Sequence, residues 1–333
     1  MVNTIYAGAN TRNHWGGSKA EIDQHIEHVT GILDGQYKKV SLFKGLAPTE
    51  HIGKTNVLRI NRIGTPKVTG RRVGERFETQ SVPTDKILIM IDTLSVIREA
   101  VDRQDDWTAP DITYKLTELN ANAFAEEYDL AHVIQLIKAR DWIAPNHLRP
   151  AFFDGIEIKT SIKKDAKTSA ELAANADILY YAHGQGVDAL VMRGMLTPNF
   201  VTLMDTPTFS TMLNHSKLMN NDWGMTNNDG FKMRRLGIMN GIRVIECNAF
   251  PKVTDVGKKH YMGDAYNVTA DDVKCRMVTF DTSMATLTVE TQPMTVEHWY
   301  DNRDFNYVID SFCMYNVGIR RPDAIVSTHI TAE

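Results

Sequence analysis

The sequence predicts an α+β protein organised around one long helix. Three observations support this fold class. Apolar residues recur at three- and four-residue steps between positions 108 and 140. In residues 54–83, apolar residues are separated by polar ones and the segment is punctuated by glycines. Apolar and polar residues alternate again in segments between 277 and 330. The chain has 333 residues, of which 43% are hydrophobic and 23% charged, and this balance is typical of a soluble folded protein with a large core or two lobes.

The first part of the chain is predicted to be an arm followed by a helix. Residues 1–17 are polar and lack periodicity, so they need other surfaces to order them. Between 18 and 35, Ser18 is placed as the N-cap, Glu21 takes the capping-box position, and apolar residues follow at helical spacing. A second short apolar segment follows at 37–46. The N-terminus shows no basic-then-apolar signal pattern.

Residues 54–83 are predicted to form a long two-stranded ribbon with an open tip. The segment has too few large apolar residues to bury a core, and a lone hairpin is marginally stable in water. Seven basic residues stand against only two acidic ones. The arginines that we expect to contact a neighbouring copy are Arg59, Arg62, Arg71, Arg72 and Arg76.

The next segment has the opposite charge, because residues 85–129 hold eleven acids and four bases. A basic ribbon beside an acidic segment suggests pairing between neighbouring copies, although pairing within one chain and a solvated loop remain open. The expected acidic partner surface consists of Asp92, Glu99, Asp105, Asp106 and Glu118.

A strand candidate at 86–97 leads to the long helix at about 108–140. Thr108 is placed as its N-cap and Pro110 in its first turn, where no amide partner is lost. A helix of this length is a rod of roughly 45 Å. Acidic residues at 126–129 interrupt its apolar stripe, so part of that face is expected to meet water or another chain. An ordinary core helix remains an equal alternative.

An α/β segment is predicted next. A strand at 152–162 is followed by a helix from 169 to about 195, with a kink or break at 183–186. A buried strand at 200–204 leads to a helix capped by Asp205 or Thr206.

The last third is predicted to be mainly β. The dipeptide at 240–241, Asn-Gly, is the strongest short hairpin signal in the chain. Residues 251–272 are polar and irregular, and we expect a surface loop there. Strands follow between 277 and 330 and are expected to return to the long helix.

No catalytic, cofactor or metal site is predicted. The Gly-Lys-Thr at 53–55 has Pro48 where a phosphate loop needs glycine, and no strand feeds a helix there. His25 and His28 lie one turn apart but have no third ligand nearby. No GxSxG nucleophile elbow occurs. The three cysteines lack CxxC spacing, and we expect them to be small buried apolar residues of a protein in a reducing compartment. No apolar run approaches the ~20 residues that span a bilayer, and the net charge of −4 argues against a dedicated nucleic-acid binder.

Several stretches carry a family resemblance. They are LRINRIGTPKVTGRRVGERF, DITYKLTELNANAFAEEYDLA, PNFVTLMDTPTFSTMLN, LGIMNGIRVIECNAFP and DFNYVIDSFCMYNVGIRRPDAIVSTHI, the last with a Gly-x-x-Arg-Pro-x-Ala pattern at Gly318, Arg321, Pro322 and Ala324. In these stretches and in element order, residues 20–330 resemble tailed-phage major capsid proteins of the Hong Kong 97 fold, above all those of short-tailed, autographivirus-type podophages. The loop at 251–272 departs from that pattern.

The resemblance implies a domain plan. It places an N-terminal arm with a helix at 1–53, an E-loop ribbon at 54–83, a peripheral (P) domain with its spine helix at 84–165, mainly an axial (A) domain at 166–272, and C-terminal β-segments returning to the P-domain at 273–333.

The resemblance also implies a structural, non-enzymatic function. The protein would self-assemble as hexamers and pentamers into an icosahedral shell around a double-stranded DNA genome. Its other partners would be a separate scaffolding protein, a portal, the packaged DNA through weak contacts, and a decoration protein in some relatives, with no membrane. It would be assembled in the host cytoplasm and reside in the virion.

Two other classes of function remain open. One is another shell or tail protein, such as an encapsulin-like compartment, which should have cargo enzymes, or a tail tube. The other is a cytosolic α/β enzyme with a mobile flap at 54–83, which should be a monomer with measurable turnover.

Overall fold

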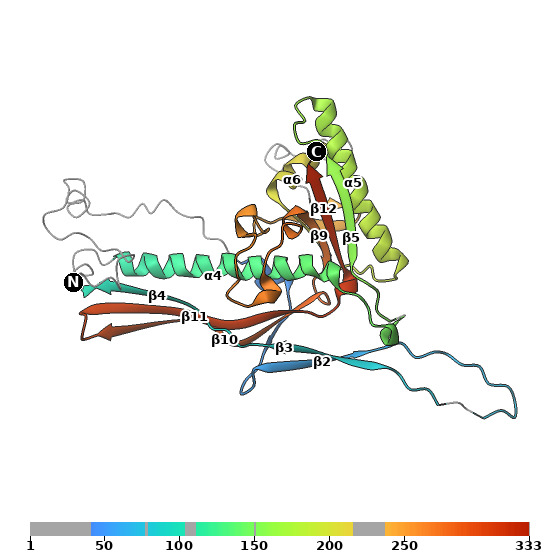
Figure 1. The fold of residues 1–333 in the computed structure, drawn as a ribbon, viewed down its shortest axis with the longest axis horizontal. Helices are drawn as coiled ribbons and strands as arrows, with labels where there is room; N and C mark the ends of the chain where they lie inside the picture. The colour runs from blue at the N-terminus through green and yellow to red at the C-terminus, as the bar shows by residue number, and fades with distance from the viewer. Residues whose placement is uncertain (1–40, 77–78, 104–110, 150, 216–236, 333) are drawn as a thin grey trace, which may run out of the picture.

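The computed structural model describes residues 41–76, 79–103, 111–149, 151–215 and 237–332. The predicted arm and helix before residue 36, the proposed cap at Thr108 and Pro110 all lie outside these residues. Figure 1 shows a long helix lying along one sheet, a second sheet standing at one end of this helix, and a thin ribbon projecting below it. None of the described helices is both long and apolar enough to cross a membrane.

The predicted long helix is confirmed as α4, which spans Asp111–Lys138 and is followed by a 3-10 turn at Ala139–Asp141. Residues 131–137 are buried on every side, because this half of the helix is covered by both sheets and by the segment between β8 and β9. Earlier positions such as Glu126 are exposed. The helix is therefore a core helix at its C-terminal half and a one-sided surface helix before it.

A four-stranded sheet packs beneath α4 in the order β1-β10-β11-β4. Its strands are β1 (Thr49–His51), β10 (Thr286–Asp301), β11 (Asn306–Ile319) and β4 (Ser95–Asp102). Strand β10 is long, and its pairing with β11 is irregular between Glu290 and Thr295. The short helix α2 (Phe43–Leu46) places Phe43 in the same core.

A six-stranded sheet has the order β5-β12-β9-β6-β8-β7. Its strands are β5 (Ile156–Ile162), β12 (Ile325–Ala332), β9 (Cys275–Asp281), β6 (Phe200–Met204), β8 (Ile242–Glu246) and β7 (Ile238–Met239). Helices α5 (Ser169–Met192) and α6 (Thr206–Met212) cover one face of this sheet, and α4 covers part of the other. The C-terminal strands contact the long helix as expected: β10 and β11 join the sheet beneath α4, and β9 and β12 contact α4 from the six-stranded sheet.

The ribbon consists of β2 (Val57–Ile63) and β3 (Thr84–Met90), which pair antiparallel. The single strand expected at 86–97 is corrected: it is divided between β3 in the ribbon and β4 in the four-stranded sheet. The physical reason is burial at the base of the ribbon. Ile89 and Ile91 pack against Leu287 and Val289 of β10, and the chain then turns to enter the other sheet.

The break expected at 183–186 is wrong, because α5 runs unbroken from its capping box at Thr168 and Glu171. Gly186 serves close packing instead. A Cβ placed there would lie 2.9 Å from Cγ1 of Val326 and 3.3 Å from Cδ1 of Ile158, so only glycine lets the helix approach the sheet this closely.

The segment at 251–272 is more than the expected surface loop. Tyr266, at the end of a 3-10 turn at Asp264–Tyr266, and Val268, just after this turn, are both buried in the main core. The Tyr266 hydroxyl lies 2.6 Å from Oδ1 of Asn316 and accepts a hydrogen bond from the amide of Val317 on β11 at 3.1 Å. The segment looked irregular in sequence because its order comes from these long-range contacts.

Two local predictions are confirmed. Asn240 and Gly241 have φ values of 49° and 79°, as a tight hairpin turn with left-handed residues requires, and they join β7 to β8. Helix α6 begins at Thr206 after Asp205. The Asp205 side chain makes no capping hydrogen bond with the helix. It accepts a hydrogen bond from Nη1 of Arg276 at 2.8 Å instead.

Candidate subunit-contact sites

Arg62 fixes the ribbon to its own subunit. Its Nη2 donates to the carbonyl oxygens of Ile319 at 3.4 Å and Arg320 at 3.1 Å. Its guanidinium lies over the rings of Trp142 and Phe152, 5.0 and 5.7 Å from their centroids. Burial lowers the pKa of Arg62. Arg62 is therefore already engaged within its own chain, and its contact with a neighbouring copy stays a prediction.

The other ribbon arginines lie at exposed positions. Arg59 is on the outer face of β2, and Arg76 follows the tip. At the tip, Nε of Arg71 donates to the carbonyl of Glu75 at 2.6 Å, and the amide of Arg72 donates to the Glu75 carboxylate at 3.0 Å. Glu75 thus shapes the turn that presents both arginines.

The ribbon also exposes apolar side chains that the charge count did not single out. Val68 and Val73 near the tip are fully exposed. On the outer face, exposed Leu88 lies opposite Arg59 in the strand pairing, and Met90 follows on the same face. Residues 87–90 are all apolar in sequence, so only the alternation of exposure along β3 in the structure identifies this face. A face with arginine and large apolar residues is typical of a protein contact.

The expected acidic partners are less uniform. Asp92 is exposed at the end of the ribbon. Glu99 is half-buried on β4 and accepts a hydrogen bond from Nδ2 of Asn120 at 3.2 Å, and burial raises its pKa. Asp105 and Asp106 lie outside the described residues, and Glu118 lies on α4 with its side chain outside them. The structure therefore gives Glu99 a role within the subunit.

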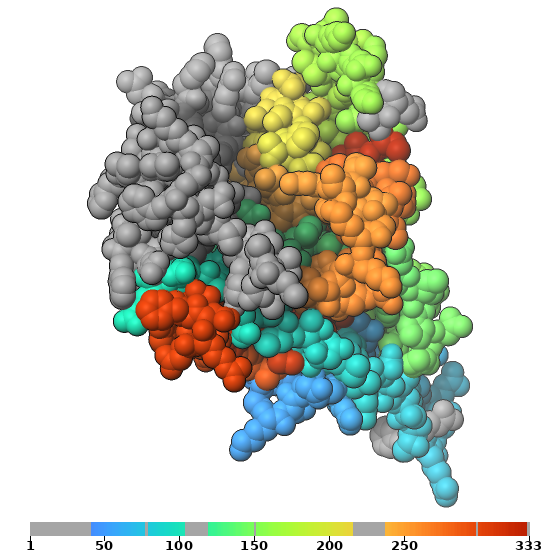
Figure 2. Space-filling model, turned by 60° about the vertical axis from the view of Figure 1, so that its left-hand side comes forward, coloured from blue at the N-terminus to red at the C-terminus, as the bar shows by residue number. Residues whose placement is uncertain are grey.

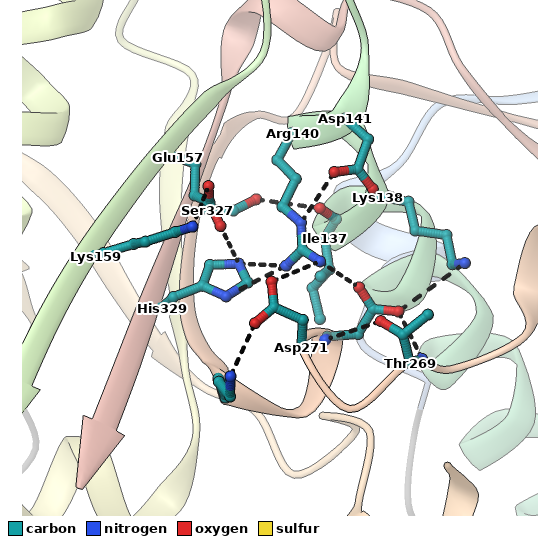
Figure 3. Close-up of polar contacts among 12 residues, drawn as sticks. Ile137, Lys138, Arg140, Asp141, Glu157, Lys159, Thr269, Asp271, Ser327 and His329 are labelled. Atoms are coloured by element: carbon teal, nitrogen blue, oxygen red, sulfur yellow. Dashed lines mark hydrogen bonds and ion pairs between the residues drawn. The ribbon is translucent and has the colours of Figure 1, made fainter. Parts of the chain in front are cut away.

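A polar cluster holds the end of α4 against the six-stranded sheet (Figure 3). Arg140, only 7% exposed, places Nη2 2.9 Å from Asp272 and 3.4 Å from Asp271, and its Nε 3.3 Å from Asp141. Its Nη1 also contacts the His329 imidazole on β12. Burial and the Arg140 charge lower the pKa of His329, so the imidazole stays neutral beside the guanidinium.

Three side chains of this cluster offer possible metal ligands. Donor atoms of Glu157, Asp271 and His329 all lie within 4.8 Å of one another. Arg140 contacts both Asp271 and His329, and Lys159 lies 3.2 Å from the Glu157 carboxylate. Arg140 and Lys159 already balance the charges of Asp271 and Glu157, so the chemistry of the cluster is that of a structural ion-pair network.

Comparisons with known proteins identify the family. No family model matches the sequence, and no curated protein does. Among solved structures, the chain is similar to a subunit of the mature capsid of bacteriophage PhiM1, with 35% identity, a TM-score of 0.79 and coverage of 99% of each chain. The chain belongs to the family of phage major capsid proteins. This capsid protein is a structural subunit of an icosahedral shell and part of the virion.

More distant structures share the capsid fold. The capsid protein is similar to the capsid subunit of cyanophage P-SCSP1u, with 16% identity, a TM-score of 0.75 and coverage of 91% of this chain and 92% of that one. It is also similar to a chain from Mycobacterium phage Che8, with 18% identity, a TM-score of 0.62 and coverage of 88% and 93%. At these identities the likeness concerns the α+β fold alone.

Proposed function

We propose that this capsid protein encloses a double-stranded DNA genome and has the domain plan of the Hong Kong 97 fold. The ribbon β2–β3 with its tip is assigned as the E-loop, α4 with the four-stranded sheet as the P-domain, and the six-stranded sheet with α5 and α6 as the A-domain. The near-complete match to a subunit of a mature capsid carries the proposal. It favours a capsid over a compartment shell, a tail tube or an enzyme.

The E-loop is proposed to contact an adjacent subunit through its outer face. The charge comes from the ribbon arginines Arg59, Arg62, Arg71, Arg72 and Arg76. The exposed Val68, Val73, Leu88 and Met90 supply apolar area. The proposed acidic partners remain Asp92, Glu99, Asp105, Asp106 and Glu118. Exposed ion pairs contribute only about 0–1 kcal/mol each, so many weak contacts must act together.

The other partners are proposed on the same basis. The subunit forms hexamers and pentamers with itself in the host cytoplasm, on a separate scaffolding protein and around a portal. Its net charge of −4 keeps contact with packaged DNA weak and non-specific. A decoration protein is a further proposed partner, and the role is structural, without turnover.

Electron microscopy of the protein expressed alone and with its neighbouring open reading frames tests this function. We expect closed shells or curved sheets of repeating capsomers. A monodisperse monomer or dimer under every condition would contradict the proposal.

The variant Arg71→Glu/Arg72→Glu tests the E-loop contact. It should give folded, soluble subunits that form no shells, because the charge at the ribbon tip is reversed. Lys164→Glu/Lys167→Glu is a matched control, since it reverses two exposed cations far from the ribbon in sequence. Normal shells from the Arg71→Glu/Arg72→Glu variant would show that assembly does not depend on the charge at the tip of the E-loop.

A further inference from the structure

Helix α5 has an outer stripe that none of the described residues of its own subunit covers. The stripe consists of Ile178, Tyr181, Gln185, Asp188 and Met192, spaced three and four residues apart and all exposed. Tyr181 is 68% exposed and Met192 is 87% exposed. Isolated exposed apolar residues are ordinary on a surface, but several on one helical stripe indicate a contact. Residues 169–192 contain no lysine or arginine, so this α5 stripe is acidic as well as apolar.

A second surface has the opposite charge. In the segment after β8, Lys252, Val253, Val256, Lys258 and Lys259 are all exposed, and we call them the basic patch. Its only acid is Asp255, which lies 3.6 Å from Nζ of Lys258. In Figure 2 this segment, in light orange, lies on the surface of the molecule. Its flanks are anchored in the main core by Phe250 and Tyr266.

The two surfaces lie on opposite faces of the six-stranded sheet. Along β6, Val201 and Leu203 belong to the core that α4 and the flanks of the basic patch share. The alternate residues Phe200 and Met204 belong to the cores under α5. Successive residues of a strand point to opposite faces, so the sheet separates the α5 stripe from the basic patch. One chain therefore cannot bring them together.

We propose that the α5 stripe of one subunit binds the basic patch of the next subunit around a capsomer. Two complementary surfaces on different faces of one chain make a head-to-tail contact, which closes into a ring when the rotation between copies fits. Each subunit in the ring then uses both surfaces once. The inference rests on the proposed shell function and names the surfaces that join its A-domains.

Charge reversal with rescue tests this contact. Gln185→Lys/Asp188→Lys makes the α5 stripe basic, and Lys252→Glu/Lys259→Glu makes the basic patch acidic. Each variant alone should lower the yield of shells roughly tenfold or more, because like charges then meet at each contact in a ring. The chain that carries all four substitutions should regain shells to within about twofold, since the complementarity is restored with opposite sign.

The Lys164→Glu/Lys167→Glu variant is again the control, with circular dichroism to verify that each subunit is folded. Two outcomes overturn the contact: normal shells from both charge-reversed variants, or failure of the four-substitution chain to assemble. In either case the wild-type protein still forms shells, so the proposed shell function is unaffected. Absence of shells from the wild-type protein itself is a different result, which would overturn the proposed function and this inference with it.

Discussion

At the scale of single residues, replacing two glycines of α5 by alanine distinguishes the effect of close packing from the effect of helix propensity. Gly186→Ala should lower the free energy of unfolding by about 1–3 kcal/mol, because the new methyl group overpacks against Val326, whose Cγ1 would be 2.9 Å away. Gly184→Ala on the same helix is the control. Its Cβ would meet nothing nearer than Nδ2 of Asn240 at 3.7 Å, so alanine should be neutral or stabilising by up to about 1 kcal/mol. Urea unfolding of the subunits measures both, and equal effects would contradict the packing account.

Two buried histidines give the subunit a pH dependence. His132 places Nδ1 2.7 Å from the carbonyl of Tyr128 and Nε2 2.6 Å from the hydroxyl of Thr288. His183 similarly lies 3.0 Å from Thr202. Burial lowers the pKa of each histidine to about 4, so the folded state holds them neutral while the unfolded chain takes up protons from pH 6.5 downwards.

The free energy of unfolding should therefore be constant with respect to these groups above pH 6.5 and fall between pH 6.5 and about 4. The slope contributed is at most about 1.4 kcal/mol per pH unit for each histidine. Denaturant titrations at a series of pH values measure it. His132→Gln/His183→Gln should flatten the slope, whereas replacing the exposed His147 with Gln should leave it. An unchanged slope in the double variant would refute the assignment.

At the scale of elements, the base of the ribbon depends on one cation. Arg62→Ala removes two hydrogen bonds and two ring contacts between the ribbon and the body of the subunit. We expect the ribbon to detach more often and a protease to cleave within 64–83 several-fold faster. Arg59→Ala is the matched control, because Arg59 lies on the same strand but is exposed. Equal cleavage rates for the two variants would show that Arg62 does not anchor the ribbon.

Local chemistry made several elements predictable from the sequence. The periodicity of α4, the apolar run of β6 and the Asn240–Gly241 turn depend on neighbours within a few residues. The division of 86–97 between two sheets was not predictable, because burial of Ile91 against β10 decides it. The burial of Tyr266 likewise depends on Asn316 and Val317, about fifty residues away.

The sequence predicted the charge of the candidate contact sites, but it did not predict which groups their side chains contact. The excess of arginine in the ribbon was visible in the sequence, yet only the fold shows that Arg62 turns inward while Arg59 stays exposed. The α5 stripe and the basic patch could not be predicted as contact surfaces from the sequence, because this role depends on which face of the six-stranded sheet each one lies on. Sequence alone does not assign faces to elements that are far apart in the chain.

At the scale of the whole molecule, head-to-tail binding makes a prediction about ring size. When the Gln185→Lys/Asp188→Lys chain is mixed with the Lys252→Glu/Lys259→Glu chain, a basic stripe meets an acidic patch, and an acidic stripe meets a basic patch. Favourable contacts then require the two chains to alternate around the ring. Hexamers have an even number of places and satisfy this condition, but a pentamer must place two like chains side by side.

The mixture should therefore form tubes or open sheets of hexamers in place of closed shells, because an icosahedral shell needs pentamers at its vertices. Electron microscopy of the mixture distinguishes the two products, and the four-substitution chain serves as the control that can close. Closed shells from the mixture in normal yield would contradict the alternation. The mixture and the control contain the same four substitutions and differ in whether one chain or two chains carry them. A difference between their products therefore comes from how the chains are arranged around the ring.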